Sequence, residues 1–340
     1  GTVPRRRSAP QGATLAARQS RFRGVRLNTE MAAPTELEVE HETRYGYAAP
    51  VTQAQHLAYL KPLHDARQQL LQHELLIEPA PLQRLHDTDT FGNARVLFSL
   101  DQPHRELCVR ARSRIVLSPA QRNVDAGASP RWEDVRQRLR YEAGARYDAA
   151  VEFAQPSPYV PRLHALRDYG LASFDAGVPV AEGALNLMHR IHAVFFYEAA
   201  STEVDTPLLE AFEQRAGVCQ DFAHLMIAAL RMLGLAARYV SGYLLTKPPA
   251  GQEALVGADA SHAWVQVYCP DTPGLPGGWL ELDPTNDLVP DTSHVRLALG
   301  RDYGDVTPLR GVIRGGGQHT LDVAVNTRRV QESRARMLLS

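Results

Sequence analysis

The 340-residue sequence is poor in cysteine and lysine, and it has no long hydrophobic run. The sequence has three cysteines, Cys108, Cys219 and Cys269. This number is small and odd, so it does not fit a disulfide framework. A reducing compartment is therefore favoured, and we expect a cytoplasmic protein with a free thiol available for chemistry. No segment approaches the ~18 consecutive apolar residues of a membrane span, so no membrane partner is predicted. Lysine occurs only at Lys61 and Lys247, a skew typical of a GC-rich genome.

An excess of one charge sign occurs only in the first thirty residues. These hold seven arginines and one acid, Glu30, so they carry +6, and the formal net charge of −1 leaves −7 for residues 31–340. A mildly acidic folded part argues against a nucleic-acid partner. The basic segment 1–30 resembles an organelle transit peptide in composition, but it precedes Met31, and we expect a disordered or non-native leader.

The composition, 44% hydrophobic and 22% charged, is typical of a globular protein long enough for two domains. The predicted divisions are the leader 1–30, a β-rich N-terminal domain 31–118, a connector with one helix 119–160, a catalytic domain 161–330 and a tail 331–340.

The N-terminal region shows the alternation typical of half-buried strands. Polar and apolar residues alternate over 36–41 and over 107–111, and the strand-like runs are separated by prolines and by a turn around Gly92. This pattern predicts a small antiparallel β domain, which we expect to be a sandwich.

Helical signals follow the connector. One apolar helix face is expected to end near Tyr197, and a second helix is expected to begin at the capping Asp205 with Pro207 in its first turn and to run to Gly217. The segment 218–234 is apolar on nearly every side, so it is predicted to be a central helix. The first apolar face consists of Ala184, Leu187, Met188, Ile191 and Val194 or Phe195.

Three strand-like runs come next, at 237–245, 262–269 and 278–283. A central helix packed on an antiparallel sheet is an α+β architecture. The segment 294–330 is interpreted as a loop that leads to a final strand at 321–325.

Cys219 is the candidate nucleophile. It lies just after Gly217, at the start of the predicted central helix, where unpaired backbone N–H groups and the helix dipole favour a thiolate. A free cysteine is more often a small buried hydrophobe, so position alone does not establish catalysis.

His262 and Asp283 are candidates for its base and orienting acid. Alternation puts His262 on the same strand face as Trp264, and Asp283 on the same strand face as Glu281. On adjacent strands the imidazole and the carboxylate meet, so the imidazole can withdraw the thiol proton while the carboxylate fixes its tautomer. A lone histidine is often a surface residue and an Asp before proline is often a turn former, so the prediction depends on all three residues together.

Three segments resemble the core motifs of the transglutaminase-like superfamily, and they occur in the family's order. Residues 36–117 also resemble the β-rich N-terminal region of bacterial members, and the segment 300–311 is similar to theirs. The three motifs are Gly-Val-Cys-Gln-Asp-Phe-Ala-His at 217–224, Ser-His-Ala-Trp-Val at 261–265 and Trp-Leu-Glu-Leu-Asp-Pro-Thr at 279–285.

The resemblance implies a papain-like, transglutaminase-like α+β core preceded by a small antiparallel β domain. It also implies thiol acyl chemistry on peptide amides, with Cys219 as nucleophile, His262 as base and Asp283 as orienting acid. Such chemistry needs donors for the oxyanion: the backbone N–H of Cys219 is the first choice, and Tyr197 is the candidate side-chain donor. Packing at a helix end explains Tyr197 equally well.

Other polar residues are interpreted structurally. Gln220 and Asp221 lie in a first helical turn, where the dipole already favours an acid. His189 and His192 are three apart on a helix and have no third ligand nearby in sequence, so a surface pair is favoured. No metal and no cofactor are predicted.

We expect a cysteine protease-like amide hydrolase that acts on peptide or protein substrates through a Cys219 thioester. A protein-glutamine gamma-glutamyltransferase resolves the same thioester with a lysine amine in a site that excludes water, and the sequence leaves this alternative open. The alternative of another class is a non-catalytic scaffold whose β domain docks a partner, although the intact trio argues against it. The oligomeric state is also left open.

Overall fold

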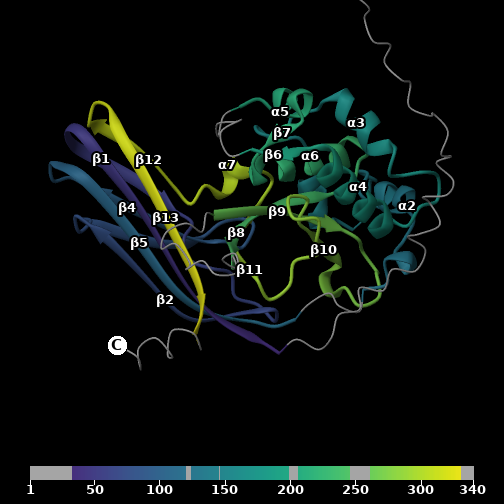
Figure 1. Cartoon of the computed structure of the whole chain (residues 1–340), viewed down its shortest axis with the longest axis horizontal. Helices are drawn as coiled ribbons and strands as arrows, with labels where there is room; N and C mark the ends of the chain where they lie inside the picture. The colour runs from purple at the N-terminus through teal and green to yellow at the C-terminus, as the bar shows by residue number, and fades with distance from the viewer. Residues whose placement is uncertain (1–32, 120–123, 145, 199–205, 246–260, 331–340) are drawn as a thin grey trace, which may run out of the picture.

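The computed structural model describes residues 33–119, 124–144, 146–198, 206–245 and 261–330. A large β-sheet occupies one side of the molecule and the helices occupy the other, with a smaller sheet between them (Figure 1). None of the helices in these ranges has the length and apolar character needed to cross a bilayer. The expected leader and tail lie outside the described residues.

The large sheet has seven antiparallel strands. They follow the order β2-β5-β1-β4-β3, and β12 and β13 pair with β1 as well. The expected sandwich is therefore wrong: these strands form one sheet with the shape of a half-barrel. The strands are β1 (Thr35–Ala58), β2 (Gln68–Glu78), β3 (Gln83–Thr88), β4 (Ala94–Leu100), β5 (His104–Leu117), β12 (Leu309–Gly315) and β13 (His319–Arg329).

The period-two pattern of β1 explains why this sheet has one buried face. Leu37, Val39 and His41 are buried. The alternate residues Glu36 and Glu38 point outward, and each pairs with an arginine of a neighbouring strand. One end of this buried face packs on the smaller sheet, and the rest forms an apolar cluster within the curved large sheet itself.

The smaller sheet is antiparallel, in the order β10-β9-β8-β11. Three of its strands match the three strand-like runs of the sequence, and α6 packs on one face as predicted. The strands are β8 (Ala237–Leu244), β9 (Ser261–Tyr268), β10 (Trp279–Leu282) and β11 (His294–Gly300).

The central helix α6 (Cys219–Met232) is buried along almost its whole length, as its sequence predicts. The other helices are α2 (Trp132–Arg138), α3 (His164–Leu171), α4 (Val180–Val194), α5 (Leu208–Gln214) and α7 (Tyr303–Val306).

Two helix ends differ from the sequence-based expectation. α4 ends at Val194, because the next residues become extended and form β6 (Phe196–Tyr197), which runs parallel to β7 (Ala216–Gly217). α5 stops before Gly217 because Arg215 adopts a left-handed conformation with φ of 55°. The expected cap Asp205 lies outside the described residues, but α5 begins at Leu208 with Pro207 at the cap position, so the predicted start, with Pro207 inside the first turn, is wrong.

The C-terminal part contains more structure than the expected loop and final strand. β11 precedes α7, and β12 and β13 then pair with the free edge of β1, from Leu37↔Arg329 to Ala58↔Leu309. The expected strand at 321–325 lies within β13. Residues 309–329 therefore belong to the same sheet as the N-terminal strands, and the domain boundaries expected from the sequence stay a prediction.

The two sheets pack face to face. Leu37, Ile115 and Val325 of the large sheet form one apolar cluster with Tyr243 and Val295 of the smaller sheet. The smaller sheet is thus covered by α6 on one face and by the large sheet on the other.

Candidate active site

Cys219 is the first residue of α6 and is partly buried. Asp221 caps this helix start, because its Oδ2 accepts the Val218 N–H at 2.8 Å. Gly217 fits closely against the same side chain: a Cβ there would lie 2.7 Å from Asp221 Cβ. The sequence Gly-Val-Cys-Gln-Asp therefore fixes where the helix begins and where the thiol lies.

His262 lies near the start of β9, and the structure brings it to both other predicted residues. Its Nε2 bonds Asp283 Oδ2 at 2.8 Å, which leaves Nδ1 for the Cys219 thiol. Burial opposes a charge on this imidazole, but the hydrogen bonds with Asp283 and Cys219 outweigh it and raise the pKa of His262 to about 10. The imidazole is therefore held as an imidazolium.

Asp283 follows β10 directly and is fully buried. Its Oδ1 accepts the backbone N–H groups of Thr285 at 2.9 Å and Asn286 at 3.1 Å. Its Oδ2 accepts His262 Nε2, Asn286 Nδ2 at 2.8 Å and His294 Nε2 at 3.1 Å. Burial opposes ionisation, yet the hydrogen bonds from His262 and His294 hold the pKa of the Asp283 carboxyl far below its usual range.

His294 and Asn286 are site residues that the sequence analysis missed. His294 is 3% exposed and its Nδ1 bonds Ser293 Oγ at 3.0 Å, which leaves Nε2 to donate to Asp283. It comes from β11, at the opposite edge of the sheet from β10, so no local pattern announces it. Asp283 before Pro284 did signal an Asx turn, which its bond to the Thr285 N–H forms, but that signal does not specify Asn at 286.

Tyr197 lies beside the helix start, since β6 pairs Tyr197 with Gly217. Its side chain is 58% exposed, and the neighbouring Phe196 is 72% exposed. Burial of the phenol raises the pKa of Tyr197, and nearby Cys219 adds to the shift. An exposed tyrosine therefore lies beside the start of the helix that carries the thiol, and the donor role of Tyr197 stays a prediction.

A second buried histidine, His224, is not suited to be the base. Its Nε2 accepts the Tyr303 N–H at 3.2 Å, and its ring lies against those of Tyr159 and Tyr239. Burial lowers the pKa of His224 to about 3, so the ring is neutral.

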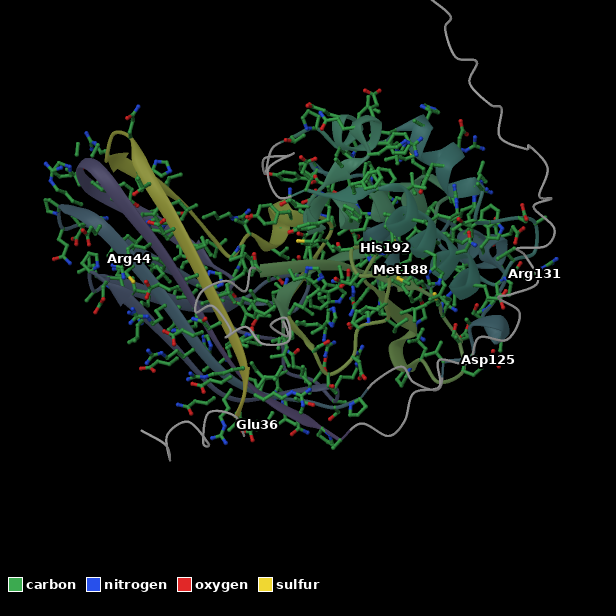
Figure 2. The ribbon with its side chains drawn as sticks, in the orientation of Figure 1. Glu36, Arg44, Asp125, Arg131, Met188 and His192 are labelled. Carbon is green, nitrogen blue, oxygen red and sulfur yellow. The ribbon has the colours of Figure 1, made fainter. Side chains whose placement is uncertain are left out.

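The histidine pair of α4 supports the loop after Asp283. His189 Nδ1 bonds the Asp287 carboxylate, and His192 Nδ1 bonds the Thr285 carbonyl at 3.0 Å. His192 is labelled in Figure 2 on the helical side of the molecule. The two rings thus face the loop that orients the carboxylate.

One group of side chains offers atoms that a metal ion could use. Donor atoms of His262, Asp283 and His294 lie within 4.8 Å of one another. The two imidazole nitrogens contact the carboxylate at 2.8 and 3.1 Å, as hydrogen-bond donors do. The same three side chains satisfy one another as hydrogen-bond partners, so their arrangement is explained without an ion.

A buried ionic cluster lies two residues before Asp283. Glu281 is 1% exposed and accepts Arg67 Nη1 at 2.9 Å, Gln266 Nε2 at 2.6 Å and Trp264 Nε1 at 3.2 Å. Arg296 Nη1 lies 3.7 Å from the same carboxylate. The charges of Arg67 and Arg296 hold the pKa of Glu281 below its usual value despite its burial.

This cluster joins the two sheets. Arg67 belongs to the connection between β1 and β2, and Asp65 from the same connection bonds Arg296 at 2.7 Å. Gln68 bonds both the N–H and the carbonyl of Arg296 at 2.7 Å. Along β11, His294 contacts Asp283 and Arg296 contacts Glu281, so the N-terminal region supports the strand that supports the site.

A central helix that begins at a thiol, packed on an antiparallel sheet that supplies an imidazole and a carboxylate, defines a papain-like α+β protein. Two family models match the sequence: the bacterial transglutaminase-like N-terminal region over residues 37–116, and the transglutaminase-like superfamily over residues 175–284. The chain belongs to the transglutaminase-like superfamily.

Full-length relatives occur in mycobacteria. Proteins described as uncharacterised in Mycobacterium tuberculosis and Mycobacterium bovis are 38% identical over 303 residues, which is 88% of this chain and 95% of theirs. A shorter match, 38% identical over 81 residues, is to a protein-glutamine gamma-glutamyltransferase of Pseudomonas aeruginosa, and it covers 24% of this chain and 11% of that protein.

A solved structure shares the fold. The crystal structure of a candidate cysteine protease from Cytophaga hutchinsonii superposes with a TM-score of 0.66, covers 88% of this chain and 92% of its own, and is 21% identical. Both the β-rich N-terminal part and the papain-like core are thus present in a known protein of the same architecture.

Proposed function

We propose that the protein is a thiol-dependent amide hydrolase that acts on peptides or proteins through a thioester at Cys219. The observation that carries the proposal is the hydrogen-bonded line from Cys219 through His262 to Asp283, whose contacts raise the pKa of His262 to about 10. A thiolate beside an imidazolium is the reactive form of a cysteine nucleophile.

In the first half-reaction, Cys219 Sγ attacks the amide carbonyl and the C–N bond breaks. The proton on His262 Nδ1 passes to the departing amine, while Asp283 keeps the ring oriented through Nε2. In the second half-reaction, water gives a proton to His262 and attacks the thioester, which releases the acid and the free thiol.

The tetrahedral intermediates need donors for their oxyanion. We assign this role to the backbone N–H of Cys219 at the start of α6, and to the Tyr197 hydroxyl on the adjacent β6.

A protein-glutamine gamma-glutamyltransferase is the second candidate. The first half-reaction is the same with a glutamine side chain, but a lysine amine takes the place of water. The match to the Pseudomonas aeruginosa transferase favours this candidate, although it covers 24% of this chain.

We further propose a cytoplasmic location, because the three cysteines are free and a catalytic thiol needs a reducing environment. A purely non-catalytic scaffold is disfavoured, since a scaffold does not need the buried charges of His262 and Asp283.

The test is to incubate the full chain with a peptide library, with and without a primary amine, and to follow products by mass. Cleaved peptides support the hydrolase, and amine adducts on glutamine support the transferase. Cys219→Ala is expected to abolish either activity, whereas Cys108→Ala, in the distant large sheet, retains it. Unchanged turnover in Cys219→Ala refutes the assignment.

A further inference from the structure

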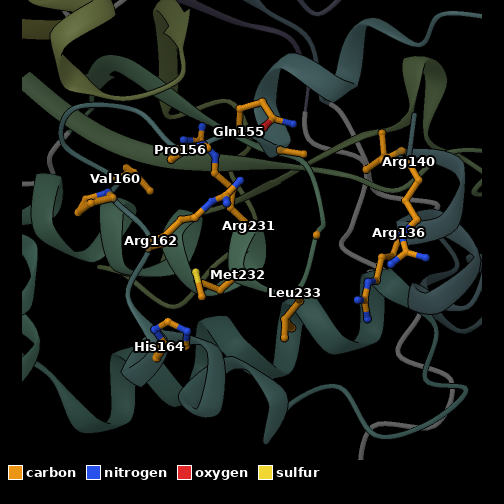
Figure 3. A pocket seen from close by; sticks show the side chains of 15 residues that line it. Arg136, Arg140, Gln155, Pro156, Val160, Arg162, His164, Arg231, Met232 and Leu233 are labelled. Carbon is orange, nitrogen blue, oxygen red and sulfur yellow. The ribbon is translucent and has the colours of Figure 1, made fainter. Parts of the chain in front are cut away.

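A cavity lies at the opposite end of α6 from Cys219. It has a volume of about 500 Å³ and is bounded by the last turn of α6, the end of α2 and the segment 154–164 (Figure 3). α6 has 14 residues, so the cavity lies about 20 Å along the helix from the thiol. It is therefore a separate site from the one described above.

The lining of this cavity carries positive charge only. Four arginines and one histidine line it, and none of its lining residues is an Asp or Glu. Figure 3 shows Arg136 and Arg140 on one side of the pocket and Arg162 and Arg231 on the other. A ligand between them thus meets guanidinium groups from two directions.

The exposed arginines are not committed to carboxylates. Within the described parts of the chain, Arg136 and Arg162 form no ion pair, and Arg140 contacts only the neutral Gln137 side chain at 3.4 Å. Arg138 on the same helix is different, because it pairs with Asp148 and with a second acid outside the cavity. At the end of α2, the arginines that face the cavity therefore differ from Arg138 in having no acid partner among the described residues.

Arg231 forms the buried back of the cavity and is held by neutral groups. Its guanidinium donates to the carbonyls of Phe153 at 2.8 Å, Ala237 at 2.8 Å and Arg301 at 2.6 Å, and to Ser157 Oγ at 3.0 Å. No carboxylate is among these bonded partners, and burial lowers the pKa of Arg231 to about 10, although the charges of Asp302 and Asp305 favour the charged form. A rigid, desolvated cation without a bonded anion raises the positive electrostatic potential of the cavity that it lines.

Apolar side chains complete the lining, including Leu139, Val160 and Met232. Cavities of this size and mixed character are typical of small-molecule sites. Guanidinium groups recognise planar or tetrahedral oxyanions through paired N–H donors.

We propose that this cavity binds a small molecule that carries a multiply charged oxyanion group, phosphate or carboxylate, on a compact apolar body. The occupant neutralises Arg231 and bridges the two arginine-bearing sides of the cavity.

The test is isothermal titration calorimetry of the full chain at about 0.15 M salt, with inorganic pyrophosphate in one arm and citrate in the other. Saturable binding of one ligand per chain is expected. Tighter binding of pyrophosphate identifies a phosphorylated ligand, and tighter binding of citrate identifies a carboxylate. Arg162→Gln and Arg140→Gln are each expected to weaken binding about ten-fold, since each removes a charged hydrogen bond.

Arg329→Gln is the matched control, because Arg329 is an exposed arginine of β13, away from the cavity. It should bind as the native chain does. Cys219→Ala should also bind normally, which separates this proposal from the proposed catalysis. Absence of saturable binding in both arms, or equal weakening by Arg329→Gln, overturns the proposal.

Discussion

Asp283 and His262 carry opposite charges in a setting from which water is largely excluded. Their pKa values move in opposite directions, because each charge stabilises the other against the cost of burial. The raised pKa of His262 adds stability that is fully present below the ordinary histidine pKa of about 6.5, and that is lost as the pH rises through about 10. Catalysis by a thiolate and an imidazolium needs the same proton on His262, so loss of that proton sets the alkaline limit of activity.

Asp283→Asn is expected to move that alkaline limit to lower pH. Without the carboxylate, burial lowers the pKa of His262 with less opposition, and a shift of about one pH unit or more follows. The measurement is the pH profile of kcat/KM for peptide hydrolysis. Asp271→Asn, at an exposed acid, is the control and should leave the limit in place. An unchanged alkaline limit in Asp283→Asn contradicts the assigned pairing.

His294→Ala is expected to lower kcat/KM about ten-fold, since Asp283 loses a charge-assisted hydrogen bond. The pKa of Asp283 then rises, so activity is lost at a higher pH as the solution is acidified. His294→Gln should restore most activity, because its amide nitrogen replaces Nε2 as donor. If both variants lose activity equally, and the pH at which activity is lost on acidification stays that of the native protein, then His294 acts only in packing.

The sequence predicted Cys219, His262 and Asp283 as site residues, but it did not reveal His294 and Asn286, which bond Asp283. Strand phases predicted that His262 and Asp283 face each other, and the structure brings them within a hydrogen bond. His294 lies beyond two intervening strands, β8 and β9, so only the register of the whole sheet reveals it. Catalytic roles for all of them stay predictions.

At the scale of elements, the start of α6 positions the nucleophile. Gly217 pairs with Tyr197 on one side and contacts Asp221 on the other, so three short elements converge there. The contact leaves no space for a side chain at position 217.

Gly217→Ala is expected to lower the free energy of unfolding by about 1–3 kcal/mol, because the added carbon forces the helix start away from β7. Cys219 moves with the helix start, so kcat should fall more than KM changes. Thermal unfolding and steady-state kinetics check both effects. Gly46→Ala is the matched control, since its added carbon meets only the Thr320 hydroxyl. A fully active Gly217→Ala enzyme disproves the role of this contact.

The hydrophobic periodicity of the sequence predicted which segments form helices and which form strands, but it did not predict where two of the helices end. The apolar face of α4 continues in sequence toward Tyr197, yet β6 forms because β7 offers backbone partners there. Pairing between segments that are distant in sequence overrides a local helix signal.

At the scale of the molecule, the large sheet is part of the support of the site. An ionic cluster lies between the sheets and consists of Arg67, Glu281 and Arg296. The negative charge of Glu281 compensates the positive charges of the two arginines.

Glu281→Gln is expected to lower the free energy of unfolding by about 3 kcal/mol, since it leaves the partly buried Arg67 guanidinium without a carboxylate and leaves Arg296 with Asp65 alone. The native pKa of Glu281 is lowered, so its contribution is present above the ordinary glutamate pKa and is lost on acidification. The variant should therefore lose less stability in acid than the native chain does. Denaturant unfolding at several pH values measures this.

Asp87→Asn, which breaks the exposed pair with Arg95, is the control and should leave unfolding unchanged. Equal stability of Glu281→Gln and native protein contradicts the role of the cluster.

The sequence predicted a β-rich N-terminal region and an α+β core, but not how they share strands. Nothing in the alternation of β12 or β13 specifies which edge they join. The expected sandwich failed because the large sheet curves and buries part of its apolar face on itself, while the smaller sheet covers the other part.

The pairing of β1 with β13 has a consequence for synthesis on the ribosome. Strand β1 emerges early, but one of its edges has no partner until the last strands are made, almost three hundred residues later. An open strand edge is a site for pairing with other chains, and closing so long a loop is slow. A nascent chain that stops before β12 thus holds an exposed edge, and we expect the completed C-terminus to be what turns an aggregation-prone intermediate into the native protein.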